Sequence, residues 1–167
     1  MKFWMTIGPS VAHIFPGSDL FYGKTTMPGG AASVNVEYKN IVYTFDTYAI
    51  DNLGNGFMTG DNASTLSAYS LLVGWRVYAD KGSVILSAGL SKGGMRITTG
   101  DAGYTNGGWL FSQEVYNHFE SDFIGVPVQI RYLTKGKHVG AELGLYCNFH
   151  RYTDMGLSAS FSFGKRK

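Results

Sequence analysis

Large apolar side chains alternate with small or polar ones along most of this 167-residue chain. Successive side chains of a β-strand point to opposite faces, so a period of two residues predicts strands rather than helices. Residues 109–120 are the clearest candidate for a helix. The strands expected from the alternation are residues 2–15, 30–38, 41–50, 65–78, 83–92, 122–132, 138–149 and 156–164. The pattern therefore predicts an all-β fold of eight strands.

The connections between these strands alternate in length. The short ones are Lys39-Asn40 and residues 79–82 and 134–137, and longer connections separate them along the chain. In an antiparallel meander, alternate connections lie at opposite ends of the sheet. The short turns are therefore expected at one end, together with both termini. No repeat or linker interrupts this order, so residues 1–167 are interpreted as a single domain.

Pairing across the short turns predicts which side chains share a face, because opposite residues of an antiparallel pair point the same way. The expected pairs are Tyr38 with Ile41, Val77 with Val84, and Tyr132 with Val139. The face collected in this way from the second to the eighth strand has no charged residue and only one that is plainly polar, Thr47. This exclusion of charge is expected where the solvent is lipid.

The opposite face carries glycine, serine and a few charges. A face exposed to water would carry more lysine and glutamate, but only 16% of the residues are charged. Small residues and paired charges suit the interior of a narrow barrel. The charges expected to form a structural polar network inside are Glu37, Asp46, Arg76, Arg131 and Glu142. A polar pathway or proton relay is the functional alternative for this network.

Two soluble architectures remain open at this point. A lipocalin-like barrel has the same strand count and alternation, with the apolar face turned inward around a ligand. It predicts an outer face rich in charge, which the second face lacks. A β-sandwich predicts connections that alternate less evenly in length.

Composition excludes several classes of function. The single Cys147 allows no intrachain disulfide and no multi-cysteine metal site, and four scattered histidines indicate no metal or cofactor. A net charge of +2 does not indicate a nucleic-acid partner. No apolar run approaches the ~18 residues of a spanning helix. The first residues lack a signal-peptide pattern, so export to the cell envelope implies that a leader has been removed.

The stretches "IGVPVQIRYLTKGKHVGAELGLYCNFH" and "GLSASFSFGKRK" resemble a hairpin and the final strand of small eight-stranded outer-membrane β-barrels, the OmpA/OmpX-like group of the porin superfamily. The resemblance covers essentially the whole chain. It implies an antiparallel up-and-down transmembrane β-barrel in a Gram-negative outer membrane, with short turns in the periplasm and long loops outside the cell. The family's final aromatic residue is often the last of the chain, whereas four residues follow Phe163.

The same resemblance implies partners. The barrel would contact outer-membrane lipid and lipopolysaccharide. The barrel-assembly machinery would recognise the C-terminal strand, whose outward-facing residues are Leu157, Ala159, Phe161 and Phe163.

The stretch between the fifth and sixth strands is unusually aromatic for a loop. The candidate interaction residues are Tyr104, Trp109, Phe111, Tyr116 and Phe119. Such a surface suits a protein partner, a glycan or a lipid headgroup. Two structural alternatives are that the stretch packs on itself and its neighbours, or that it extends the two strands beyond the membrane.

These observations favour a non-enzymatic outer-membrane protein with a structural or interaction role, including that of an accessory subunit beside another outer-membrane protein. A porin-like passage for small solutes is the first alternative. The second is a lipid A-modifying enzyme, an acyltransferase or deacylase. Its candidate residues near the outer end are His13, Asp46, His118 and His150, and their spacing matches no catalytic constellation.

Overall fold

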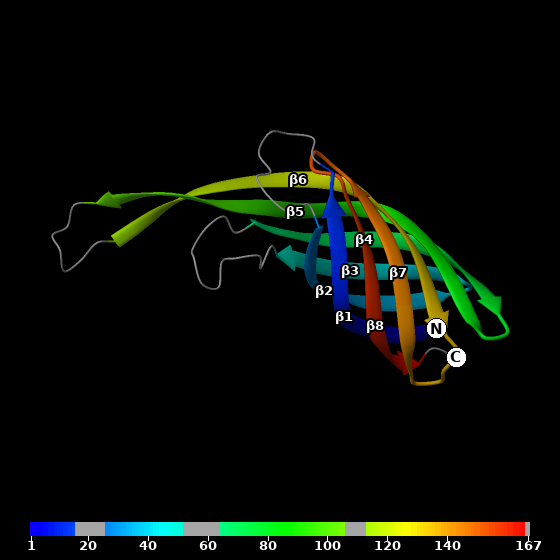
Figure 1. Ribbon diagram of the computed structural model, residues 1–167. Helices are drawn as coiled ribbons and strands as arrows, with labels where there is room; N and C mark the ends of the chain where they lie inside the picture. The colour runs from blue at the N-terminus through cyan, green and yellow to red at the C-terminus, as the bar shows by residue number, and fades with distance from the viewer. Residues whose placement is uncertain (16–25, 52–63, 106–112, 166–167) are drawn as a thin grey trace.

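The computed structural model is a closed barrel of eight antiparallel strands in which β1 also pairs with β8 (Figure 1). It describes residues 1–15, 26–51, 64–105 and 113–165, with the backbone alone for 64, 97–105 and 113–119. The strands are β1 (Lys2–Ile14), β2 (Thr26–Tyr38), β3 (Ile41–Asp51), β4 (Ser64–Ala79), β5 (Gly82–Thr105), β6 (Gln113–Thr134), β7 (Val139–Phe149) and β8 (Asp154–Lys165). The predicted fold class is confirmed. No helix in the described part of the chain is long and apolar enough to span a membrane.

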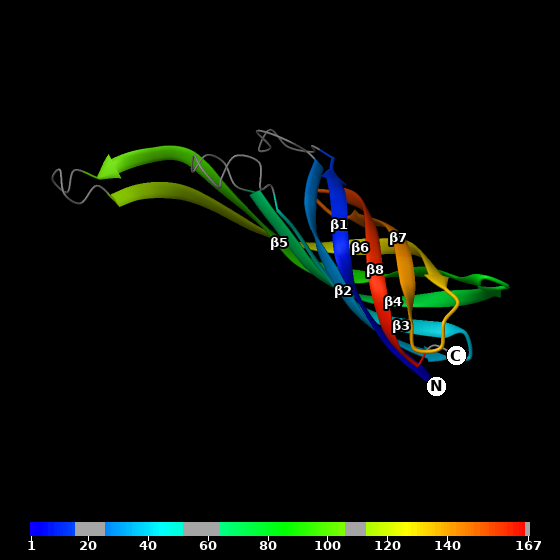
Figure 2. The same ribbon diagram turned by 60° about the horizontal axis from the view of Figure 1, so that its bottom comes forward.

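The short turns and both termini lie together at one end of the barrel, called the short-turn end below (Figure 2). The turn between β2 and β3 consists of Lys39 and Asn40, with φ values of 50° and 66°. Two positive φ angles are typical of the two-residue hairpin turns whose twist matches that of the flanking strands. Tyr38 pairs with Ile41, and Val77 with Val84, as predicted.

The predicted register between β6 and β7 is wrong. Tyr132 pairs with Leu143 rather than Val139. The Thr134 hydroxyl accepts a hydrogen bond from the Ala141 amide at 2.9 Å and contacts the Ala141 carbonyl oxygen at 3.1 Å. A side chain therefore replaces the next backbone pair and closes a wider turn. The displacement is an even number of residues, so every side chain keeps its predicted face.

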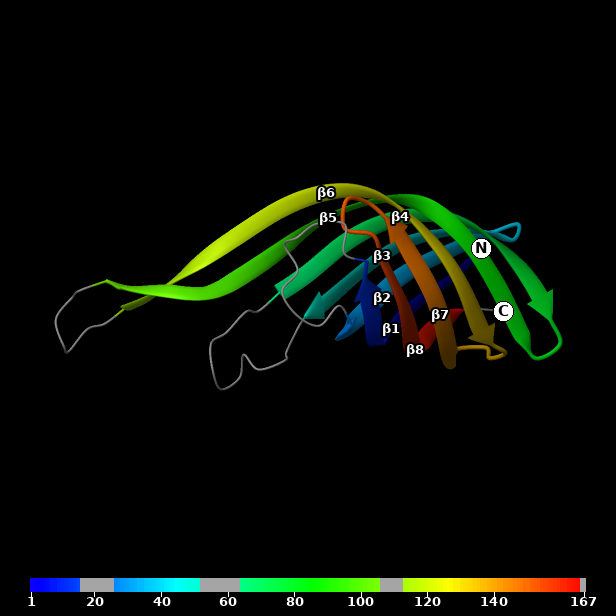
Figure 3. The ribbon, with the colours of Figure 1, turned by 45° about the horizontal axis from the view of Figure 1, so that its top comes forward.

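β5 and β6 are much longer than predicted and continue past the rim of the barrel as a two-stranded ribbon (Figures 1 and 3). Ile97 pairs with Phe119, and Gly103 with Val115 after a register shift. The predicted helix over residues 109–120 is therefore wrong for its described part, because β6 begins at Gln113. Cross-strand pairing outweighs the local helix preference of the Gln and Glu residues there.

The outer wall of the barrel is apolar, as the sequence predicts. Exposed side chains include Ile124 at 77%, Leu71 at 68% and Phe161 at 64%. β8 shows the alternation directly, since Leu157, Ala159, Phe161 and Phe163 face outward. Between them, Ser160 and Ser162 are buried in the interior. The inside-out interpretation of the two faces agrees with the structure.

This polarity reverses at the end opposite the short turns. On β4, β5 and β6 the outward positions there are polar or charged, as at Lys92, Arg96 and Asp122, which are exposed. The inward positions form an apolar cluster that the sequence analysis did not anticipate, and its buried members are Ala12, Ile14, Met27, Tyr48, Ile50, Leu66, Ala68, Met95, Phe123, Tyr146 and Tyr152. Strands with an apolar core inside and charge outside are built for water. The reversal therefore marks where the apolar wall ends.

Gly8 allows close approach at the seam that closes the barrel between β1 and β8. A Cβ atom built on Gly8 would overlap the carbonyl oxygen of Ala159, whereas one on Gly30 would meet its nearest neighbour at 3.9 Å. We predict that Gly8→Ala lowers the free energy of unfolding by about 1–3 kcal/mol through overpacking. Urea titration of the detergent-folded barrel, followed by gel mobility, measures this change.

Gly30→Ala is the matched control, because Gly30 lies on the neighbouring strand β2 and pairs with Pro9. Its effect should stay within about 0.5 kcal/mol. Equal losses for both variants would contradict the assignment of close packing to the seam.

Candidate functional site: the barrel interior and the ribbon

The interior near the short-turn end is organised around Glu37. Its carboxylate accepts a hydrogen bond from Arg76 Nη1 at 2.7 Å and one from the Tyr78 hydroxyl at 2.6 Å. Lys2 Nζ lies 3.4 Å from the same carboxylate. The Arg76 guanidinium is also 5.2 Å from the ring of Trp4, which is fully buried. Each buried charge thus has an opposite charge and further partners, as burial in a narrow lumen requires.

A second layer is centred on Arg131, nearer the middle of the barrel. Its Nη1 donates to Asn35 Oδ1 at 2.8 Å, and its Nη2 donates to Thr44 Oγ1 at 2.7 Å. Glu142 lies 3.6 Å from Arg131. Asp46 instead accepts a hydrogen bond from Gln129 Nε2 at 2.7 Å.

All five predicted interior charges thus lie inside. Four of them form the pairs Glu37–Arg76 and Arg131–Glu142, while Asp46 is paired with an amide rather than an arginine. Their role as structural supports stays a prediction.

The void between these side chains is small. A cavity of about 20 Å³ is bordered by Thr6, Asp46, Gln129, Arg131 and Glu142, among others. That volume accommodates one or two water molecules. Toward the end opposite the short turns, the apolar cluster fills the lumen. The described interior therefore resembles a packed core more than a pore.

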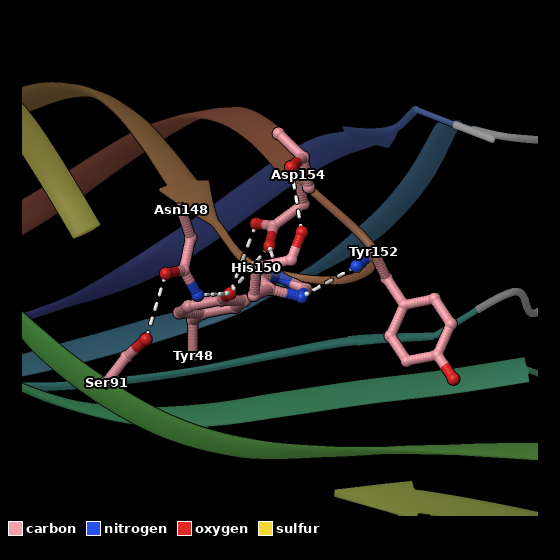
Figure 4. A network of polar contacts seen from close by, with 7 residues as sticks. Tyr48, Ser91, Asn148, His150, Tyr152 and Asp154 are labelled. Carbon is pink, nitrogen blue, oxygen red and sulfur yellow. Dashed lines mark hydrogen bonds and ion pairs between the residues drawn. The ribbon is translucent and has the colours of Figure 1, made fainter. Parts of the chain in front are cut away.

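Buried polar groups at the opposite end form a second network, which we call the rim network (Figure 4). Asp154 accepts hydrogen bonds from the Tyr48 hydroxyl at 3.0 and 3.1 Å, and its Oδ1 lies 2.7 Å from His150 Nε2. Asn148 Nδ2 donates to the Tyr48 oxygen at 3.0 Å, and Ser91 donates to Asn148 Oδ1 at 2.9 Å. These five residues come from β3, β5, β7, β8 and the turn after β7. The network therefore ties several strands together.

His150 is held from three sides. The Tyr152 amide donates to Nδ1 at 3.1 Å, so Nε2 faces Asp154. Phe123 stacks on the imidazole with ring centroids 3.8 Å apart and planes 7° apart. A histidine acting as general base needs one ring nitrogen oriented by a partner and the other free for the substrate proton. Both nitrogens are engaged here, which is the geometry of a structural bridge.

The structure does not bring the described catalytic candidates together. His13 Nδ1 lies 3.0 Å from Thr26 Oγ1, Asp46 contacts Gln129, and His150 contacts Asp154. The side chain of His118 lies outside the described residues. In the part of the chain that is described, no three His, Cys, Asp or Glu side chains are grouped to hold a metal ion.

The sequence pattern did not predict that one network joins four of these residues, namely Tyr48, Ser91, Asn148 and Asp154. Asp154 was assigned to the connection before the last strand, although it begins β8. The signal available in the sequence was the placement of Tyr48 and Tyr146 on the inward face, where large hydroxyl-bearing rings need partners. The partners come from strands far apart in the sequence, so spacing alone could not identify them.

Among the strands described, the ribbon has an unpaired edge on each side. β4 pairs with β5 as far as Ile97, and β7 pairs with β6 only from Val126 onward. Residues 98–105 of β5 and 113–125 of β6 therefore have a paired neighbour on one side only, among the strands described. Tyr104, Tyr116 and Phe119 belong to this ribbon by their backbones. Trp109 and Phe111, and the side chains of all five aromatic candidates, lie outside the described residues.

We predict that Tyr48→Phe lowers the free energy of unfolding by about 1–3 kcal/mol, because it removes the buried hydroxyl that donates to Asp154 and accepts from Asn148 Nδ2. Tyr69→Phe is the control, since Tyr69 is 60% exposed on the outer wall. It should change stability by less than about 0.5 kcal/mol. Denaturant unfolding of both variants under identical conditions makes the comparison, and equal effects would contradict a stabilising rim network.

No protein-family model matches the sequence, and no curated protein matches it either. Solved structures do match its fold. The attachment invasion locus protein Ail of Yersinia pestis superposes with a TM-score of 0.65 at 7% identity, covering 98% of this chain and 97% of that one. Neisserial surface protein A gives 0.65 at 14% identity, covering 98% and 96%.

The N-terminal β-barrel domain of Pseudomonas aeruginosa OprF gives a TM-score of 0.50 at 12% identity, covering 96% and 97%. Identities this low show the fold alone. The closed barrel, its apolar wall and these three likenesses agree, and the chain has the fold of the small eight-stranded outer-membrane β-barrels.

Proposed function

We propose that this protein is a non-enzymatic barrel of the outer membrane whose β5–β6 ribbon is its interaction surface. The observation that carries the proposal is the pair of strand edges beyond the barrel rim that have no partner among the described strands. The barrel itself acts as the anchor that presents the ribbon outside the cell, and the short turns face the periplasm.

The apolar wall supports a location in a membrane. Exposed residues such as Val73, Leu86, Val128 and Leu145 would be costly in water but are favoured in hydrocarbon. Exposed charges return at both margins of this apolar wall. Lys92 and Asp122 lie beyond it toward the ribbon, and Lys39 and the other short turns lie at the opposite end. An apolar belt between two charged margins is what a bilayer requires. We also propose that the barrel-assembly machinery recognises β8, whose outward-facing side chains include Phe161 and Phe163.

The ribbon edges support a protein partner that binds by strand addition. An unpaired edge presents a row of backbone N–H and C=O groups that can pair with another strand. Such pairing supplies affinity, while neighbouring side chains supply specificity. Nothing in this mode requires a pocket, and the aromatic residues of the segment would add contact area.

The charge of the ribbon segment argues against a polyanionic ligand. Residues 93–123 contain one arginine, Arg96, against the carboxylates of Asp101, Glu114, Glu120 and Asp122. Ail has been solved in complex with sucrose octasulfate, a heparin analogue, so a barrel of this fold can hold a sulfated ligand. An acidic ribbon would repel such a ligand. A strand of a protein partner therefore suits this chain better.

The interior supports neither alternative function. A 20 Å³ cavity below a packed apolar cluster offers no room for a solute. The His150 side chain is fully buried and has both ring nitrogens engaged. These observations favour an anchoring role for the barrel and leave interaction to the ribbon.

We predict that Val73→Arg, in the middle of the apolar wall, destabilises the barrel in lipid vesicles by about 2–4 kcal/mol. Thr65→Arg is the control, because Thr65 lies on the same face of β4 beyond the apolar wall. It should cost less than about 1 kcal/mol there. Denaturant titrations in vesicles measure both values, with heat-dependent gel mobility confirming that each barrel has folded. Equal effects would argue against membrane embedding.

We further predict that a photo-crosslinking residue at Glu120 or Asp122, on β6 of the ribbon, captures a discrete polypeptide in intact cells. The same probe at Arg151, exposed in the turn between β7 and β8, should capture none. Shortening the ribbon by replacing residues 98–118 with a two-residue Asn-Gly turn should abolish the adduct of the probe at Glu120 and of the probe at Asp122.

Heat-dependent mobility of the shortened variant shows whether its barrel still folds, which separates loss of the partner from loss of the fold. Equal adducts from Glu120 and Arg151 would contradict a specific ribbon surface. So would adducts that persist after the ribbon is shortened.

A further inference from the structure

Every turn at the short-turn end of the barrel carries an exposed lysine. Lys39 lies between β2 and β3, Lys81 between β4 and β5, and both Lys135 and Lys137 lie between β6 and β7. These four residues are called the lysine ring below. Because the three turns belong to different hairpins of a closed barrel, the charges are spread around its circumference. This distribution places positive charge on several sides of the end rather than in one patch.

The lysine ring has little opposing charge. Asp80 is the exposed carboxylate of the described turns at this end. Lys135 Nζ contacts the backbone carbonyl of Asp80 at 3.2 Å rather than its carboxylate. Glu37 is nearby in sequence but lies buried inside against Arg76. Among the described residues, the four lysines form no salt bridge, so their ammonium groups remain available to an external anion.

Aromatic residues place this ring at a defined depth. Tyr38 precedes Lys39 directly, and Lys39 Nζ lies 5.3 Å from the centre of its ring. Tyr132 donates a hydrogen bond to the Lys81 carbonyl at 3.3 Å. Trp75 is exposed on the outer wall and pairs with Ile41, which directly follows the turn that contains Lys39. Exposed Tyr and Trp side chains of membrane barrels are enriched at the interface with water, and their position beside these turns puts the lysines at the level of the lipid headgroups.

The opposite rim differs in charge. There Lys92 and Arg151 are accompanied by the carboxylates of Glu120 and Asp122, and Arg96 forms an ion pair with Glu120. A mixed surface of this kind attracts anions weakly, because each cation is partly neutralised. Among the residues that the structure describes, the cationic character is therefore specific to the short-turn end.

We propose that the lysine ring binds anionic phospholipid headgroups of the phosphatidylglycerol type in the leaflet that surrounds the short-turn end. The inference rests on the membrane location proposed above and goes beyond it by assigning a lipid class and residues. Ammonium groups donate hydrogen bonds to phosphate oxygens, and basic residues at a membrane surface attract anionic lipid. The ring would thus hold a shell of anionic lipid around the base of the barrel.

Quenching of Trp75 by brominated lipids tests this inference in the full chain. The protein carries Trp109→Phe, and Trp4 is enclosed in the interior, so Trp75 is the tryptophan in contact with lipid. It is folded into equimolar vesicles of phosphatidylcholine and phosphatidylglycerol, with bromine on the chains of one lipid or the other. The ratio of the two quenching strengths reports which lipid lies beside Trp75.

We expect phosphatidylglycerol to be favoured severalfold at low salt, with the ratio approaching one at about 1 M salt, where the Debye length is ~3 Å. Lys39→Gln/Lys81→Gln should move the ratio toward one at low salt as well. Lys92→Gln/Arg151→Gln removes the same charge from the opposite rim and should keep the preference. A quenching ratio that falls in Lys39→Gln/Lys81→Gln but not in Lys92→Gln/Arg151→Gln supports the lysine ring as the binding surface.

Several outcomes would overturn the inference. A ratio of one in the unsubstituted ring, with clear quenching by both lipids, would refute lipid selection while leaving membrane embedding intact. Absence of quenching by either lipid would refute the membrane location itself. Equal loss of preference in both double variants would deny the ring any special role. A ratio of one together with lysine-dependent sedimentation on purified peptidoglycan would assign the ring to an anionic polymer instead.

Discussion

The closed backbone ladder between β1 and β8 is the constraint on which the rest of this structure depends. A strand in hydrocarbon has no water to satisfy its N–H and C=O groups, so an open sheet edge within a bilayer costs several kcal/mol per group. Closure removes that cost and allows the apolar face to turn outward. It also forces the remaining face into a lumen so narrow that each buried charge needs a partner, which Glu37 finds in Arg76 and Glu142 in Arg131.

The polarity reversal along the strands divides the molecule into parts with different tasks. Within the apolar wall, charges and serines fill the lumen. Beyond it, an apolar cluster and the rim network of Tyr48, Asn148, His150 and Asp154 close the interior. The ribbon continues past that closed end, and its outer edges have no partner among the described strands, which is tolerable because water satisfies the backbone there. The anchoring and interaction roles proposed above would thus fall to the apolar wall and the ribbon, on either side of the closed end.

The prediction of faces proved more secure than the prediction of register. Face depends only on whether a residue is odd or even within its strand, so the error that paired Tyr132 with Val139 moved no side chain to the other face. Strand ends were harder to predict, as the ribbon shows, because the outward positions after Leu90 no longer continue the apolar stripe, as Lys92 and Arg96 show. The helix expected over residues 109–120 is wrong from Gln113 onward, because pairing with β5 does not show in a local sequence pattern.

The sequence by itself determined the number of strands, their alternation of faces and the inside-out polarity, because these follow from side-chain period and solvent preference. It also indicated Glu37, Asp46, Arg76, Arg131 and Glu142 as interior groups. Only the tertiary structure decided which of them meet, that Asp154 joins Tyr48 and His150, and that β5 and β6 leave the barrel together. Those contacts join residues as far apart as Tyr48 and Asp154. They depend on barrel curvature and register, which a local sequence pattern does not encode.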